Sequence, residues 1–97
     1  MDDEKIIALY WQRDESAITA TDTKYGALLR TLSSGIVASR EDAEECVNDT
    51  YMALWGAMPP KWTERLRAYA AETARNISLR RYRDGRTLRR GAGEVPL

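Results

Sequence analysis

The chain has 97 residues, 43% of them hydrophobic and 31% charged, with a formal net charge of zero and no histidine. This length suits one domain with a small core and leaves little room for a deep catalytic cavity. The single cysteine, Cys46, excludes an internal disulfide and is consistent with a reducing cytosol. No apolar run approaches the ~20 residues that span a bilayer, and the acidic start MDDEK differs from a signal peptide. We therefore expect a soluble, cytoplasmic protein with no membrane partner.

The charges are unevenly distributed along the chain. Residues 1–50 carry five Lys and Arg against eleven Asp and Glu, whereas residues 51–97 carry ten Lys and Arg against four Asp and Glu. Seven arginines fall within residues 75–90. Such asymmetry indicates partners of opposite sign, for example a basic protein surface and a nucleic acid. The alternative is that the two halves simply attract each other within the fold.

Two helices are predicted in the first third of the chain. Residues 2–13 form the first, because acidic residues suit the positive end of a helix dipole and Ile6, Leu9 and Tyr10 recur at helical spacing. After a break at residues 14–16, a second helix is expected over residues 16–34, and Gly35 is expected to end it. Its buried face is predicted to consist of five large apolar residues: Ile18, Tyr25, Leu28, Leu29 and Leu32.

Ser39 is the expected N-cap of a third helix, because it precedes acidic residues that suit the first turns of a helix. Pro60 removes a backbone donor and constrains Pro59, so this helix should end near Met58. Its apolar face is predicted to be Ala43, Val47, Tyr51, Leu54 and Met58, with Cys46 and Trp55 on the flanks.

A fourth helix is expected from Trp62 or Thr63 to about Arg83, where Asp84-Gly85 should stop it. Residues 1–84 would then form the domain, and residues 85–97 a polar linker or tail. The inward face of this helix is predicted to be Leu66, Tyr69, Ala70, Thr73, Ala74 and Ile77. No strand pattern and no internal repeat appear. The predicted fold is all-α, a small bundle of about four helices.

The residue types disfavour catalysis. Without histidine, no imidazole is present to act as a base or a metal ligand. Cys46 lies on an apolar helical face, where packing is its expected role. The acidic cluster at residues 41–45 has no Gly-rich phosphate loop to accompany it. We expect no enzymatic activity, no cofactor and no metal site.

Two surfaces are better candidates for function. On the third helix, residues spaced by three and four form a polar stripe: Glu41, Glu45, Asn48, Asp49 and Met52. This stripe is either a solvated face or, because it ends in an apolar residue, a docking site for a partner helix. The fourth helix and the segment before it combine arginines with aromatic residues, which favours single-stranded nucleic acid. The alternative reading is a basic helix end without a partner.

The motif REDAEECVNDTYMALW (residues 40–55), followed by PP and by RLRAY and ARNISLRRYR within residues 65–83, resembles region 2 of bacterial sigma-70 family transcription factors. It is most similar to the extracytoplasmic-function group, over about residues 5–90. The resemblance implies a promoter-selecting subunit of RNA polymerase whose acidic helix docks on the clamp helices of the polymerase β′ subunit. Glu45, Asn48 and Asp49 match the family's contact positions, and Glu41 and Met52 extend the same face.

The resemblance also implies that the loop at residues 56–63 and the next helix recognise the −10 promoter element and hold a flipped base of the non-template strand. Lys61 and Trp62 are the candidates for lining the pocket of that base. The DNA contacts expected on the next helix are Arg65, Arg67, Arg75, Asn76, Arg80 and Arg83, although Asn76 could equally cap or brace the core. An anti-sigma factor is a further partner that the resemblance allows.

Two departures from the family pattern stand out. Arg80 occupies a position where the family often has an aspartate, so the local polar network should differ. The family normally carries a second domain, region 4, and GEVPL reads as a linker cut short, so we expect a piece of a longer protein. The competing interpretations are a generic basic helical nucleic-acid binder without a polymerase partner and a purely structural interaction module.

Overall fold

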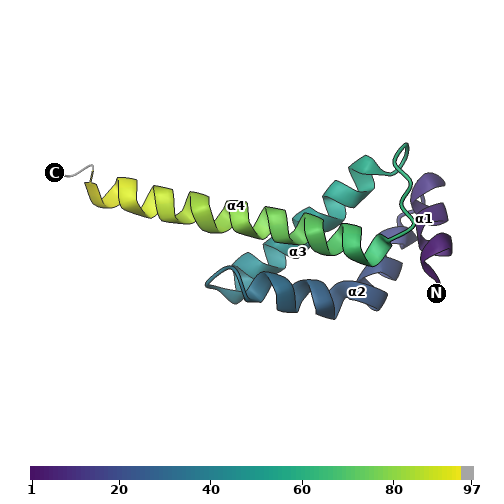
Figure 1. Ribbon diagram of the computed structural model, residues 1–97, viewed down its shortest axis with the longest axis horizontal. Helices are drawn as coiled ribbons and strands as arrows, with labels where there is room; N and C mark the ends of the chain where they lie inside the picture. The colour runs from purple at the N-terminus through teal and green to yellow at the C-terminus, as the bar shows by residue number, and fades with distance from the viewer. Residues whose placement is uncertain (95–97) are drawn as a thin grey trace.

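Four helices make up the part of the chain that the structure describes. The computed structural model describes the backbone of residues 1–94 and the side chains of residues 1–85. The helices are α1 (Asp3–Trp11), α2 (Ser16–Ser34), α3 (Arg40–Ala57) and α4 (Leu66–Glu94). Figure 1 shows α2, α3 and α4 packed together, α1 at one end of them, and α4 extending beyond the others. The predicted all-α bundle of about four helices is confirmed.

Side-chain caps define where α1 and α3 begin. The Asp2 carboxylate accepts a hydrogen bond from the Lys5 amide at 3.0 Å. The Ser39 hydroxyl accepts one from the Asp42 amide, also at 3.0 Å. Each bond satisfies an amide that has no partner in the first turn of a helix. The predicted N-cap Ser39 and the predicted bounds of the second helix are confirmed, and α2 ends before Gly35 as expected.

A Schellman motif closes the end of α1. The Asp14 amide donates to the Leu9 carbonyl and the Arg13 amide to the Tyr10 carbonyl, each at 3.0 Å. This motif requires a left-handed residue just after the C-cap, and Arg13 occupies that position with a φ of 56°. Within the described part of the chain, Arg13 is the one residue other than glycine with a positive φ.

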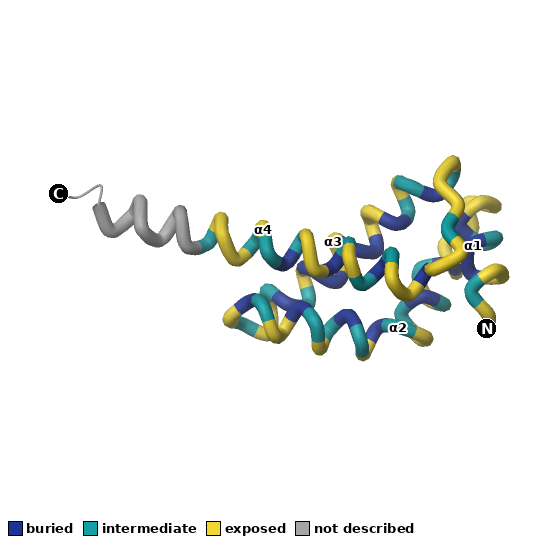
Figure 2. The backbone as a smooth tube through the Cα atoms, viewed as in Figure 1, coloured by how far each residue is buried: buried dark blue, intermediate teal, exposed yellow. Residues whose placement is uncertain are grey.

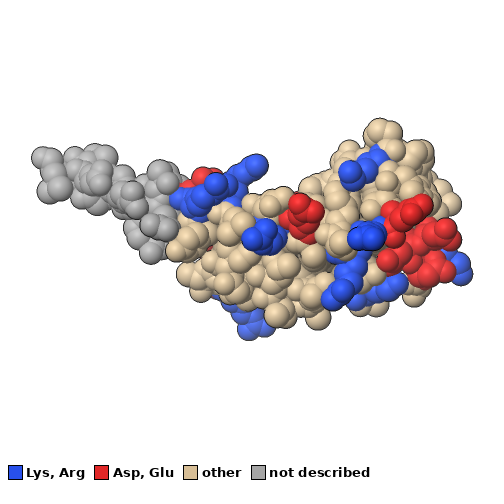
Figure 3. All heavy atoms as spheres, viewed as in Figure 1, with Lys and Arg blue, Asp and Glu red and all other residues tan. Residues whose placement is uncertain are grey.

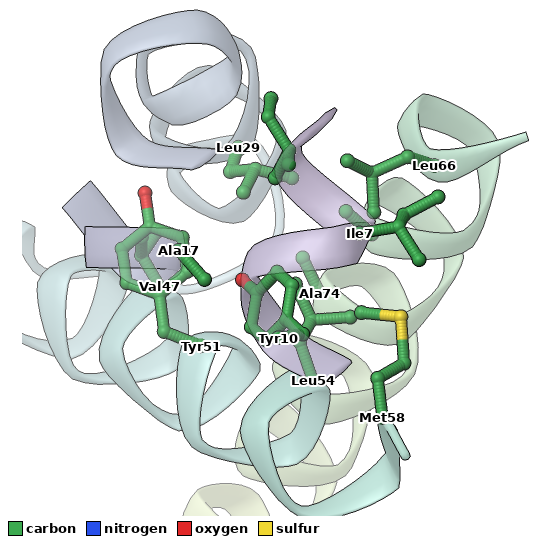
Figure 4. Packing of buried hydrophobic residues seen from close by; sticks show 12 residues of the cluster. Ile7, Tyr10, Ala17, Leu29, Val47, Tyr51, Leu54, Met58, Leu66 and Ala74 are labelled. Atoms are coloured by element: carbon green, nitrogen blue, oxygen red, sulfur yellow. The ribbon is translucent and has the colours of Figure 1, made fainter. Parts of the chain in front are cut away.

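The core lies where α1 meets the three longer helices. Ile6, Ile7 and Tyr10 of α1 are buried in it. Figure 4 shows Ile7 and Tyr10 among buried residues of α2, α3 and α4. The predicted apolar face of the third helix is buried throughout. That of the fourth helix is buried at Leu66, Ala70 and Ala74 and partly buried at Tyr69, Thr73 and Ile77. Because each large apolar side chain contributes about 1.5–3 kcal/mol when fully buried, this cluster dominates stability.

The buried face of α2 is rotated relative to the prediction. Of the five residues expected there, Leu29 alone is fully buried, and the other four are partly buried. α2 packs against both α3 and α4, so small residues are needed where the three helices approach, and four of the larger apolar residues are only partly buried. Figure 2 shows buried and partly buried positions alternating along α2. The residues that α2 buries are Ala17, Thr21, Gly26, Leu29 and Ser33.

Two pairs of hydroxyl groups lie inside the bundle. The Tyr10 and Thr21 hydroxyls are 2.7 Å apart, and Thr21 also donates to the Ala17 carbonyl at 2.8 Å, so Tyr10 is the donor of the pair. The Ser78 hydroxyl donates to Ser33 at 2.9 Å. An unpaired buried hydroxyl costs about 1–3 kcal/mol. These pairs therefore fix how α2 lies against α1 and α4.

Both ends of α4 differ from the prediction. The helix begins at Leu66 instead of residue 62 or 63, because the Thr63 hydroxyl accepts a bond from the Arg65 amide at 3.1 Å and forms a turn ahead of it. It also continues through Gly85 to Glu94 instead of stopping near Arg83. A single glycine costs a helix only about 1 kcal/mol, and the arginines around it are good helix formers. The role of residues 85–97 as a linker stays a prediction, and residues 95–97 lie outside the described residues.

A polar network joins α2 to α3. One carboxylate oxygen of Asp22 accepts hydrogen bonds from the Tyr51 hydroxyl at 2.6 Å and from the Arg30 guanidinium at 2.8 Å. Arg30 also donates to Glu44 at 3.1 Å. The bond from Tyr51, together with Arg30, holds the pKa of Asp22 below its ordinary value of 3.8. Gly26 leaves room for this pair, because a Cβ there would lie 2.5 Å from the same Asp22 oxygen.

Replacing Asp22 by Asn should lower stability at neutral pH and have less effect in acid. The pKa of Asp22 is lower in the folded than in the unfolded chain, so its stabilisation is present above about pH 4 and is lost as the pH falls through the folded pKa. We expect a loss of about 1 kcal/mol at pH 7, because the network is partly exposed. Urea unfolding at neutral and acidic pH measures it. Glu15→Gln is the control, and an equal loss at both pH values would contradict the assignment.

Candidate functional site

One side of α3 stays exposed along the whole helix. The five residues that the sequence places on the polar stripe are all exposed, and we call them the α3 stripe: Glu41, Glu45, Asn48, Asp49 and Met52. They lie on the opposite side of the helix from its buried residues, as the spacing of three and four requires. Met52 is 56% exposed although it is apolar. The structure thus brings these five residues together on one surface.

Arg81 of α4 lies along one edge of the α3 stripe. Its guanidinium is 3.2 Å from Glu45, 3.4 Å from Asp42 and 3.8 Å from Asp49. The hydrogen bond to Glu45 raises the pKa of Arg81 further above its usual range. These pairs are partly exposed, so each contributes at most about 1 kcal/mol. Arg81 is not among the predicted site residues, because nothing local in the sequence marks its partners on another helix.

The loop between α3 and α4 is in contact with α1. The Trp11 indole nitrogen donates to the Lys61 carbonyl at 3.1 Å, and the Trp11 ring meets Trp62 edge-on with ring centroids 6.0 Å apart. Trp62 is nevertheless 49% exposed. The Lys61 ammonium lies 4.9 Å from the centre of the Tyr69 ring on α4, within cation–π range.

The side chains of Lys61 and Trp62 therefore contact different helices, α4 and α1 respectively. Trp62 borders a hollow of about 250 Å³ together with Thr63 and residues of α1, and Lys61 is not among the residues that line it. Three carboxylates, Asp3, Glu4 and Glu64, border the same hollow. This lining disfavours a phosphate there, so the exposed face of Trp62 is the part of the loop best suited to a nucleobase.

Arg13 binds the end of α3. One guanidinium nitrogen donates to the Trp55 carbonyl at 2.7 Å and to the Met58 carbonyl at 2.8 Å. Carbonyls at a helix C-terminus have no partner within the helix, and a cation is favoured there by the helix dipole. The guanidinium also lies 3.8 Å above the Trp55 ring. Sequence reasoning missed Trp11 and Arg13, because their partners are 42 to 50 residues further along the chain.

The residues predicted to bind nucleic acid on α4 and just before it lie on more than one side of the helix. Asn76, Arg80 and Arg83 border one hollow of about 590 Å³, and we call them the basic strip. Arg65 and Arg67 border another hollow, of about 450 Å³, beside Leu28 of α2. All eight residues predicted to contact DNA, including Arg75 and the loop residues Lys61 and Trp62, are exposed, so bracing of the core is not the role of Asn76.

Positive and negative side chains are concentrated in different parts of the visible surface. Figure 3 shows Lys and Arg side chains spread along α4 and acidic side chains gathered at the α1 end. The side chains of Arg86, Arg89 and Arg90 lie outside the described residues.

A family model described as Sigma-70 region 2 matches residues 22–87, more than half of the chain. The chain belongs to the sigma-70 region 2 family. This sigma factor region takes part in RNA polymerase binding and promoter recognition, and the family is not an enzyme family. Searches among curated proteins and among solved structures gave no match. None of the described helices carries an apolar stretch sufficient to cross a membrane.

The matched residues can be located on the helices. It contains most of α2, all of α3 and every described side chain of α4, and therefore both the α3 stripe and the basic strip. α1 and Arg13 precede the matched residues.

Charge reversal within the α3 stripe should affect stability differently at two neighbouring positions. Glu45→Arg removes a partner of Arg81 and brings two cations together, so we expect a loss of about 0.5–1 kcal/mol. Asn48 stands outside the ion pairs of Arg81, and Asn48→Arg should change stability by less than about 0.5 kcal/mol. Urea unfolding at low and high salt measures both. Equal losses, or a Glu45→Arg loss that does not shrink with salt, would contradict the ion pairs.

Proposed function

We propose that this sigma region 2 is of the extracytoplasmic-function type and docks on the β′ clamp helices of RNA polymerase through the α3 stripe. The observation that carries the proposal is the stripe itself: five exposed residues, three of them acidic, opposite the buried face of α3. Complementary charge steers a basic partner to such a surface. The exposed side chain of Met52 supplies an apolar contact at its end.

The second proposed contact is with the −10 promoter element as a single strand. The exposed ring of Trp62 is available to stack on a base, and Lys61 and the basic strip are available to phosphates. Extruding a base costs a few kcal/mol. Stacking on an aromatic ring is worth about 1–3 kcal/mol per base and would offset this cost. Polymerase supplies the chemistry, so this role requires no catalytic residue.

Holding both partners at once is consistent with how the two helices pack. α3 and α4 lie against each other, and Arg81 joins them. A clamp helix on the α3 stripe and a DNA strand along α4 would therefore keep a fixed relation. Such a complex acts in the bacterial cytoplasm, and an anti-sigma factor that covered the α3 stripe would compete with polymerase.

Asn48→Arg should weaken docking on the β′ clamp helices by about tenfold or more, because it sets a like charge against a basic surface. Asn48 is preferred to Glu45 for this test because it is outside the ion pairs of Arg81. The measurement is titration of the chain with an isolated β′ clamp-helix fragment. Thr31→Arg on α2, also exposed, is the matched control.

Equal affinity of Asn48→Arg and Thr31→Arg for the fragment would contradict docking through the α3 stripe. If the wild-type chain bound nucleic acid but not the fragment, the chain would act as a basic helical nucleic-acid binder without a polymerase partner.

Trp62→Ala should weaken binding to single-stranded DNA more than binding to duplex DNA. Loss of one stacked base predicts about a fivefold to hundredfold effect on the single strand. Fluorescence anisotropy with labelled −10-like strands, alone and paired, measures the difference. A uniform loss on both substrates would argue against base capture. A flat response to salt would contradict the phosphate contacts, because about three or four of them predict a log–log slope of roughly −2 to −3.

A further inference from the structure

We propose that Trp11 and Arg13 are positioning residues for the DNA-binding loop. They belong to the α1 corner, residues 11–13, which lies outside the family match at residues 22–87. In this proposal the corner holds Lys61 and Trp62 in the arrangement that receives single-stranded DNA, without touching DNA itself. The inference rests on the proposed function of the loop, and the experiment below separates the two.

The first observation is the residue type at the left-handed position. Arg13 has a φ of 56°, and a glycine would take this conformation more easily because it has no Cβ. The Schellman motif that closes α1 uses only the backbone of Arg13. The motif therefore does not require an arginine at this position, so the Arg13 side chain must have another role.

The second observation is where the Arg13 side chain ends. A single nitrogen of its guanidinium donates to two carbonyls, those of Trp55 in the last turn of α3 and Met58 just after the helix. The guanidinium carbon lies 3.8 Å from the centre of the Trp55 ring. The planar guanidinium makes the hydrogen bonds and the ring contact together, which the point charge of a lysine does not. Arg13 thus fixes how the chain leaves α3.

The third observation is that Trp11 makes a similar contact with a backbone carbonyl three residues after Met58, in the loop. Its indole donates to the Lys61 carbonyl, and its ring supports that of Trp62. Trp11 is 42% exposed, so core packing alone does not account for its position. Together, Trp11 and Arg13 hold the carbonyls at positions 55, 58 and 61, which span the end of α3 and the middle of the loop.

A loop fixed before binding does not lose conformational freedom when DNA arrives, and this preorganisation increases affinity. Loosening the α1 corner should therefore weaken DNA binding. It should leave polymerase docking unchanged, because the α3 stripe lies on the exposed side of α3 and none of its residues contacts Trp11 or Arg13 through a described hydrogen bond or ring contact.

Arg13→Gly is the decisive variant, because it suits the backbone and removes only the side chain. Trp11→Phe keeps a ring against Trp62 but loses the donor to Lys61, and Gln12→Ala truncates an exposed side chain of the same corner as a control. Each 97-residue variant is titrated with a fluorescein-labelled, mixed-sequence single strand of about 12 nucleotides, within the site size of single-strand binders. Binding to the β′ fragment, urea unfolding and amide hydrogen exchange across residues 56–65 are measured in parallel.

We expect Arg13→Gly to weaken single-strand binding about five- to tenfold, and Trp11→Phe about two- to fivefold. Amide exchange in the loop should accelerate, whereas the β′ affinity and the unfolding midpoint should stay near those of the Gln12→Ala control. Rescue of the loop by Arg13→Lys would show that charge alone suffices and would overturn the role of the planar guanidinium.

Parallel loss of β′ binding, DNA binding and stability would show a general structural role and overturn the proposal. Unchanged loop exchange in Arg13→Gly would also overturn it. If the wild-type chain bound no single-stranded DNA, the proposed DNA function would fail and the positioning role for DNA with it. The two failures remain distinguishable, because loop exchange reports on the corner without DNA.

Discussion

The structure depends on α3 burying one face between α2 and α4 while its opposite face stays in water. On the buried face, Val47, Tyr51 and Leu54 belong to the main core, and Ala43 and Cys46 pack with Val37 in a second, smaller cluster. The residues on the exposed face form the α3 stripe. Because a helix fixes the angle between its faces, packing one of them determines where the other points. The core therefore orients the surface proposed to meet polymerase.

Three arginines bind α3, one from the turn after α1, one from α2 and one from α4. Arg13 binds its C-terminal carbonyls, Arg30 binds Glu44 near its start, and Arg81 binds the acidic side chains along its edge. The ion pairs of Arg30 and Arg81 are partly exposed, so each adds little to the free energy of unfolding. Their larger effect is geometric, because each fixes one neighbouring segment against the helix. Arg81 also shows that the acidic first half and the basic second half of the chain do attract each other within the fold, at least at this edge.

Much of the fold was predictable because its signals are local. Ser39 and the acidic turn after it mark the start of α3, and the spacing of apolar residues identifies the buried faces of α3 and α4. The buried face of α2 was not predictable, since it depends on how closely two neighbouring helices approach. The end of α4 was also missed, because Gly85 reads as a stop in the sequence although a single glycine is a small cost within a long helix.

For the site, the sequence by itself determined which residues share a helix face. It therefore predicted the α3 stripe and the exposed arginines of α4. Helical spacing contains that information, because residues three and four apart always lie together. Only the tertiary structure decided that Arg81 lies along the stripe, that Arg67 faces α2, and that Trp11 and Arg13 hold the loop. Those contacts join residues far apart in the chain, and their formation depends on the packing of four helices into one core, which no short stretch of sequence specifies.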